Sequence, residues 1–161
     1  MNSPTSPYST IAATSHSIKN LDVSPVELVQ ASLDRINQLD GKVNSFITVC
    51  EQLALKAAKK AEREIAAGKY RGPMHGITYT LKDGIDTKGI RTTHANLKGL
   101  DLKPKVSSST HTLLEEAGSI LVGKVNIDST VFGSLDRPIE ALNPWDTKLS
   151  PGGSSSGPGS A

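Results

Sequence analysis

Two parts of the sequence carry side chains suited to hydrolytic chemistry. One is the run 150–161, in which every residue except the final alanine is glycine, proline or serine. The other is Lys82, which follows an alternation of apolar and polar residues and precedes Asp83-Gly84, a pair typical of turns. Such a glycine and serine run is equally typical of a flexible linker or tail. A lysine at the end of a strand is, by itself, most often a plain surface residue.

A lysine and a serine-rich loop could together perform nucleophilic catalysis. A serine hydroxyl is a weak nucleophile, so it attacks an electrophile only if a base removes its proton. Lysine serves as that base in its neutral form, which burial or nearby positive charge favours. In α/β proteins ligands gather beyond the carboxyl ends of strands, and the alternation before Lys82 puts it at such an end.

Four segments, read together and in this order, resemble a known family. They are GITYTLKDGIDTKG at 76–89, AGSILVGKVN at 117–126, NPWD at 143–146 and PGGSSSG at 151–157. The sequence from about Ser24 onward resembles the amidase signature family, serine hydrolases of carboxamides. The resemblance implies an α/β amidase signature fold, a mixed β-sheet covered by helices, of which this chain would be an incomplete N-terminal portion.

The family's catalytic device consists of a nucleophilic serine, a second serine in a cis peptide, and a lysine. The resemblance implies that Lys82 is the lysine and that Ser154 relays the proton between lysine and nucleophile. Gly152 and Gly153 would let the backbone enter and leave the cis geometry, and Ser155 would support the site by hydrogen bonding. The nucleophile lies further along in related enzymes, so we expect this polypeptide alone to be inactive.

Two departures from the family pattern and two alternative functions stay open. Pro158 stands where a small residue is usual, and Asp128-Ser-Thr130 replaces a more usual acidic-aromatic pattern, which suggests an altered substrate pocket or a decayed copy. The Ser-Ser-Ser loop and the run 89–93 resemble general amidases more than the amidase-like subunit of a glutamine-dependent tRNA amidotransferase. That subunit, and a non-catalytic amidase remnant, are the alternatives. A phosphate-binding loop is disfavoured because no lysine follows the glycines.

The amino-acid composition argues against several classes of binding partner. The 161 residues include 18 basic and 16 acidic ones, a net charge of +2, and 4% aromatic residues. This gives neither an electrostatic nor a stacking case for direct nucleic-acid binding. The single cysteine, Cys50, has no internal partner, so a cytoplasmic compartment is expected. No stretch reaches the ~18 apolar residues of a membrane span. We expect a small-molecule amide substrate and no cofactor, metal or membrane partner, with a homo-oligomer left open.

Capping and periodicity predict the elements that position these residues. We expect residues 1–23 to form a leader with a weak helix, and residues 24–161 to form the N-terminal part of the family domain. Ser24 is a good N-cap, Glu27 completes a capping box, and Gly41 is the expected stop of the helix between them. The apolar stripe of this helix consists of Val26, Val29, Leu33 and Ile36.

Strands and helices then alternate along the chain. Alternating or β-branched runs predict strands over 43–50, 74–81 and 119–125. Good helix formers and caps predict helices over 51–67 and 107–117, with a loop over 87–106. This order predicts some parallel pairing in the sheet. We expect Cys50 to be a buried apolar residue, His75 to make structural hydrogen bonds, and Trp145 to pack.

Overall fold

The structure is a computed structural model that describes residues 6, 9–96, 101–128 and 140–161. These residues form two compact units. The first comprises the described residues of Met1–Arg35, Cys50–Tyr79 and Leu113–Val122, and the second those of Ile36–Val49, Thr80–Thr112 and Gly123–Ala161. The elements are α1 (Ile11–Lys19), α2 (Pro25–Val43), β1 (Phe46–Val49), α3 (Glu51–Ala66), β2 (Thr78–Lys82), α4 (Ser109–Glu116), β3 (Ile120–Val125) and α5 (Ser156–Ser160).

Helix α2 begins as its capping sequence predicts. The Ser24 Oγ accepts a hydrogen bond from the Val26 N–H at 2.9 Å, and the Ser24 N–H donates to Glu27 Oε2 at 2.7 Å. The predicted stop at Gly41 is wrong, because α2 continues to Val43. The left-handed residue that ends the helix is Asn44, at φ 51°, whose N–H donates to the Asp40 carbonyl at 2.7 Å.

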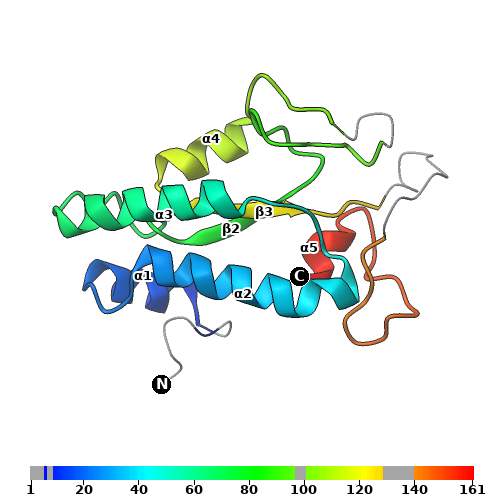
Figure 1. Ribbon diagram of the computed structural model, residues 1–161, viewed down its shortest axis with the longest axis horizontal. Helices are drawn as coiled ribbons and strands as arrows, with labels where there is room; N and C mark the ends of the chain where they lie inside the picture. The colour runs from blue at the N-terminus through cyan, green and yellow to red at the C-terminus, as the bar shows by residue number, and fades with distance from the viewer. Residues whose placement is uncertain (1–5, 7–8, 97–100, 129–139) are drawn as a thin grey trace. The chain divides into compact units, whose positions relative to one another are not determined.

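The core of the first unit is a small apolar cluster contributed by α1, α2, α3 and the segment before β2. In Figure 1, α1 and the first part of α2 lie side by side. Leu28, which the predicted stripe leaves out, is buried in this cluster, whereas Val26 is only half-buried. The packing partners of a helix, rather than its own periodicity, select which apolar residues are covered. The cluster consists of Ile18, Val23, Leu28, Ile65 and Ile77, with Tyr70 and Met74 packed against it.

The sheet has three strands in the order β1-β3-β2, so its middle strand is the last in sequence. β1 pairs antiparallel with β3, with Phe46 opposite Val125 and Val49 opposite Gly123. The β2 side is parallel, because two hydrogen bonds advance in the same direction along both segments. They run from the Ile120 N–H to the Ile77 carbonyl at 2.8 Å and from the Asp83 N–H to the Val125 carbonyl at 2.9 Å. The predicted mixed sheet is therefore confirmed.

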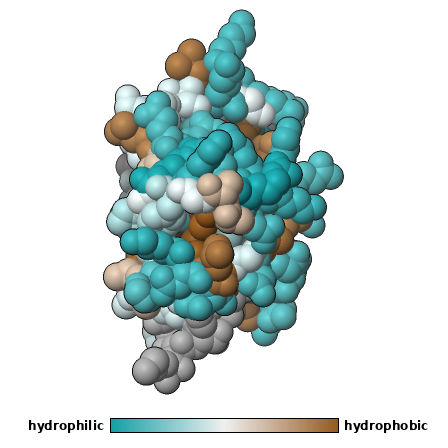
Figure 2. Space-filling model, turned by 90° about the vertical axis from the view of Figure 1, so that its left-hand side faces the viewer, coloured by the Kyte–Doolittle hydropathy of each residue, from teal (hydrophilic) through white to brown (hydrophobic). Residues whose placement is uncertain are grey.

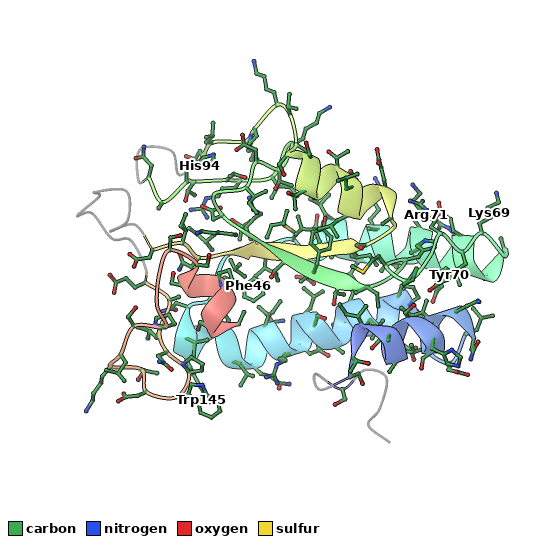
Figure 3. The ribbon with its side chains drawn as sticks, turned by 180° about the vertical axis from the view of Figure 1, so that it is seen from behind. Phe46, Lys69, Tyr70, Arg71, His94 and Trp145 are labelled. Carbon is green, nitrogen blue, oxygen red and sulfur yellow. The ribbon has the colours of Figure 1, made fainter. Side chains whose placement is uncertain are left out.

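Every residue of β3 is buried, as expected for the central strand of a covered sheet. Cys50 is also buried, in line with its predicted apolar role, and lies at the start of α3. Trp145 contradicts its predicted packing role, since 95% of its surface is exposed and it extends away from its loop in Figure 3. Among the helices that the structure describes, none combines the length and apolar character needed to cross a membrane.

Candidate active site

Lys82 and the serine-rich loop meet within the second unit. Lys82 is the last residue of β2, so its side chain leaves the sheet at a carboxyl end, as the sequence predicts. Its Nζ donates a hydrogen bond to Ser154 Oγ at 2.5 Å and another to Ser155 Oγ at 3.1 Å. One amine thus contacts two adjacent hydroxyls that lie 72 and 73 residues further along the chain.

The loop that carries these serines has an unusual backbone. The peptide bond between Gly153 and Ser154 is cis, which agrees with the expectation from the family resemblance. Gly152 has a φ of 90°, a conformation that L side chains rarely adopt. The position of a Cβ on Gly153 lies 2.6 Å from Asp128 Oδ2, so a side chain there would require Asp128 to shift. Asp128 also donates its backbone N–H to the Ser154 carbonyl at 3.0 Å.

Directly after the loop, α5 is fixed to the end of β3. The Gly157 N–H donates to the Asn126 carbonyl at 3.0 Å. A Cβ on Gly157 would lie only 2.1 Å from the Asn126 nitrogen, so the two backbones approach as closely as glycine permits. The Ser160 hydroxyl donates to the Leu142 carbonyl at 2.7 Å. Ser154 and Ser155 are therefore held from both sides, by Asp128 and by α5.

The Lys82 side of the site is supported by a group that the sequence interpretation missed. Asp83 lies in the predicted turn, but its side chain is fully buried, with Oδ2 accepting hydrogen bonds from the N–H (2.8 Å) and the hydroxyl of Thr93. Lys124, in the middle of buried β3, is also fully buried. The available signal was a lysine inside the apolar run 120–125, where a charge needs internal partners.

Several other predicted residues lie elsewhere. His75, in the first unit, makes the structural contacts expected of it, since its Nδ1 accepts from the Arg71 N–H at 3.2 Å. Pro158 is an exposed residue of α5. Ser129 and Thr130, part of the departure from the family pattern, fall outside the described residues. In the part of the chain that is described, no three His, Cys, Asp or Glu side chains gather closely enough to hold a metal ion.

The first unit has an apolar pocket of roughly 180 Å³ that contains neither Lys82 nor Ser154. Figure 2 views the end of the molecule where α3 ends and shows a small group of hydrophobic residues among hydrophilic ones. The pocket involves residues of α1, α2 and α3 and the loop between the first two helices. Its lining residues are Ile18, Leu21, Val23, Ser24, Pro25, Glu62, Ile65 and Ala66.

Comparison with known proteins shows the family of the chain. A family model described as Amidase matches residues 27–161. A glutamyl-tRNA(Gln) amidotransferase subunit of Prochlorococcus marinus is 40% identical over 143 residues, which are 87% of this chain and 29% of that protein. The subunit of the same name from Geobacter metallireducens is 42% identical over 147 residues, 89% of this chain and 30% of that one.

Solved structures show the same likeness. The native peptide amidase of Stenotrophomonas maltophilia superposes with a TM-score of 0.86 at 29% identity, covering 94% of this chain and 33% of that one. A bacterial aryl acylamidase superposes with a TM-score of 0.84 at 26% identity, covering 93% and 32%.

The chain thus spans about a third or less of each of these proteins. The relatives found by sequence are amidotransferase subunits, at 40% and 42% identity, and the similar solved structures are amidases, at 29% and 26% identity. These sequence identities do not support the expectation that the chain is closer to general amidases. Matched over residues 27–161 and superposable on solved amidases, the chain belongs to the amidase signature family.

Proposed function

We propose that the whole protein to which this chain belongs hydrolyses the carbon–nitrogen bond of a small carboxamide, with Lys82 as the base and Ser154 as the proton relay. The observation that carries the proposal is the 2.5 Å contact between Lys82 Nζ and Ser154 Oγ. A proton can pass between two groups at hydrogen-bond distance, and positioned acid–base groups contribute roughly 10²- to 10⁴-fold to a rate.

The proposed reaction begins with neutral Lys82, which takes the hydroxyl proton of Ser154 while Ser154 takes the proton of the nucleophilic serine. That nucleophile is expected further along the full-length chain, as in the family. Its oxygen attacks the amide carbon, the carbon–nitrogen bond breaks, and the proton returns through Ser154 to the leaving amine. Water then attacks the acyl-enzyme by the same relay, which releases the acid and restores the serine.

The surrounding residues support this use of Ser154. Gly152 has a positive φ that would strain any other residue, and a side chain at Gly153 would require Asp128 to shift. Ser155 accepts a second hydrogen bond from Lys82 at 3.1 Å, which limits the directions that the amine can take. We propose that Ser155 orients Lys82 and that the glycines hold the loop, without direct parts in proton transfer.

Substitution of the two proposed catalytic residues in the full-length protein tests the proposal. We expect Lys82→Ala and Ser154→Ala each to reduce kcat on an aryl amide by at least about 10²-fold, while the circular dichroism spectrum stays that of the parent. Lys56→Ala is the matched control, because Lys56 is an exposed lysine of α3. Parental turnover by Lys82→Ala would refute the assigned base.

A second function is favoured by the sequence relatives, which are named as subunits of glutamyl-tRNA(Gln) amidotransferase and are 40% and 42% identical. We propose as the alternative that the protein releases ammonia from glutamine for a partner, with the same two residues. Ammonia release from glutamine, measured beside aryl amide hydrolysis, separates the two. Aryl amide turnover by the purified protein supports the first function, and release from glutamine alone supports the second.

A further inference from the structure

Lys124 is a fully buried ammonium in the centre of the sheet, and the proton relay does not use it. It lies in β3, and its Nζ donates hydrogen bonds to the Ile85 carbonyl at 2.7 Å and to Thr92 Oγ1 at 2.8 Å. It also lies 4.0 Å from Asp83 Oδ1, and neither side chain is exposed to solvent. A buried charge is tolerated only where such partners replace water, so these contacts fix where the ammonium lies.

The three side-chain contacts of Lys124 described above lie in the loop that begins directly after Lys82. Asp83 is the first residue of that loop. Its carboxylate accepts hydrogen bonds from the N–H and the hydroxyl of Thr93, so the two ends of the loop are held together. Thr92 accepts from Lys124 and donates to the Ile90 carbonyl at 3.2 Å. The ammonium therefore ties both the start and the end of the loop to β3.

The same contacts reach the main chain of Lys82. The Ile85 N–H donates a hydrogen bond to the Lys82 carbonyl at 2.9 Å, and the Ile85 carbonyl accepts the hydrogen bond from Lys124 Nζ. Two residues further along the chain, Asn126 holds Gly157 and with it the loop of Ser154. The end of β3 thus sets the position of both halves of the candidate site.

We propose that Lys124 is a positioning residue for Lys82, an inference that rests on the proposed function. Its buried ammonium holds the loop 83–93 so that the Lys82 amine stays within hydrogen-bond distance of Ser154. A displacement of about 1 Å at a reacting group can cost on the order of 10²-fold in rate. The alternative is that the buried pair of Lys124 and Asp83 contributes to folding alone.

The test uses the full-length protein with both charges removed together. Lys124→Met alone would leave a buried carboxylate without its counter-charge, which destabilises a fold strongly. The double variant Asp83→Asn/Lys124→Met keeps similar volumes and no net buried charge. We expect kcat to fall by roughly 10- to 100-fold with KM nearly unchanged, at temperatures well below the unfolding midpoint. A parental kcat would overturn the proposal.

Thr48→Val is the matched control for this variant. Thr48 lies opposite Lys124 in the sheet, and its buried Oγ1 has no hydrogen-bond partner among the described residues. This change therefore alters β1 directly opposite Lys124 and leaves Ile85, Thr92 and Asp83 unchanged. Its kcat should stay at the parental value. A loss as large as that of the double variant would show that any change in the sheet disturbs the site, and would overturn a specific role for Lys124.

A double-mutant cycle separates positioning from a general structural effect. Rates are measured with an activated aryl ester, whose better leaving group keeps slow variants measurable. If Lys124 acts through Lys82, Asp83→Asn/Lys124→Met causes little further loss in the Lys82→Ala background. An equal fold-loss in both backgrounds overturns the proposal. Parental activity of Lys82→Ala alone would instead refute the proposed function, and the role of Lys124 with it.

A milder variant keeps the test decisive if the double variant does not fold. Thr92→Val removes one acceptor of the Lys124 ammonium and retains the shape of the side chain. We expect Thr92→Val to lower kcat and leave KM unchanged, as for the double variant. In the Lys82→Ala background, Thr92→Val should cause little further loss of rate. A parental kcat for Thr92→Val with the double variant unfolded would assign Lys124 to folding alone.

Discussion

His75 is a buried titratable residue whose charge state depends on two neighbours in the first unit. Its ring is fully buried, its Nδ1 accepts from the Arg71 N–H, and its Nε2 lies 3.3 Å from Glu64 Oε2. Burial is the main cause that lowers the pKa of His75, and the Arg71 charge lowers it further, against an opposing effect of Glu64.

The pKa of Glu64 is also lowered, but for a different reason. Burial would raise the pKa of Glu64, but the hydrogen bond and charge of Arg71, 2.6 Å away, outweigh it, with smaller contributions from Lys60 and His75, and leave the pKa lowered. The stability that this carboxylate contributes is present above its unfolded pKa and is lost as pH falls through the lowered folded value. That window lies at more acid pH than the window of His75.

We predict that stability falls as pH decreases through the range in which unfolded histidine gains a proton. The folded pKa of His75 is lowered, so its contribution is complete above about pH 6.5 and is lost as pH falls. The free energy of unfolding of the full-length protein, measured from about pH 7.5 to 5.5, should drop by at most about 1.4 kcal/mol per pH unit from this residue. His75→Asn, whose side-chain oxygen can still accept, should flatten that slope. An identical slope in parent and variant would assign the effect to other groups.

Glycines within regular elements differ sharply in what surrounds them. Gly41 lies inside α2, is exposed, and has no atom within 4 Å of the position of a Cβ. Gly123 lies inside β3, where a Cβ would be 2.7 Å from the Thr48 carbonyl oxygen and 2.8 Å from a ring carbon of Phe46. The first glycine only weakens its helix, whereas the second permits close packing of two strands.

These surroundings predict opposite effects for the same substitution. Gly41→Ala should raise the free energy of unfolding by roughly 0.5–1 kcal/mol, because alanine loses less backbone entropy in a helix. Gly123→Ala should lower it by roughly 1–3 kcal/mol through overpacking against β1. Urea unfolding of both variants in the full-length protein measures the difference. A stable Gly123→Ala variant would mean that β1 moves without cost.

At the scale of the whole molecule, the chain corresponds to part of its longer relatives. It spans 29% and 30% of the two amidotransferase subunits compared above. The proposed base and relay lie together in its second unit, and the family's nucleophilic serine is expected beyond the relay.

We predict that a polypeptide of residues 1–161 alone does not hydrolyse amides, because the relay then has no nucleophile to activate. Product release from an aryl amide should equal the buffer blank, while the full-length protein turns the substrate over. The Lys82→Ala version of the short polypeptide is the control for contaminating activity. Turnover by residues 1–161 that is lost in that control would show that a serine within them acts as the nucleophile.

Much of the local structure followed from the sequence because it depends on near neighbours. The capping box at Ser24 and the strand before Lys82 require only a few adjacent residues. The box formed as expected, and the strand formed over Thr78–Lys82, shorter at its start than the predicted range 74–81. The four family segments were sufficient to indicate the fold, and the family match over residues 27–161 confirmed it. The stop at Gly41 was wrong because a glycine in a helical conformation is no barrier, and Asn44 took the left-handed position instead.

Contacts between distant parts of the chain could not be read in this way. The 2.5 Å contact between Lys82 and Ser154 depends on β2 lying beside β3, because Asn126, which follows β3, holds Gly157 after the serine loop. The pairing of β2 with β3 buries Lys124 and Asp83 together, although a lysine in a strand and an aspartate in a turn are usually exposed. Sequence periodicity describes one element at a time, so it predicted the kinds of residue in the site. The packing of the strands determined which charged side chains are buried and which amine contacts which hydroxyl.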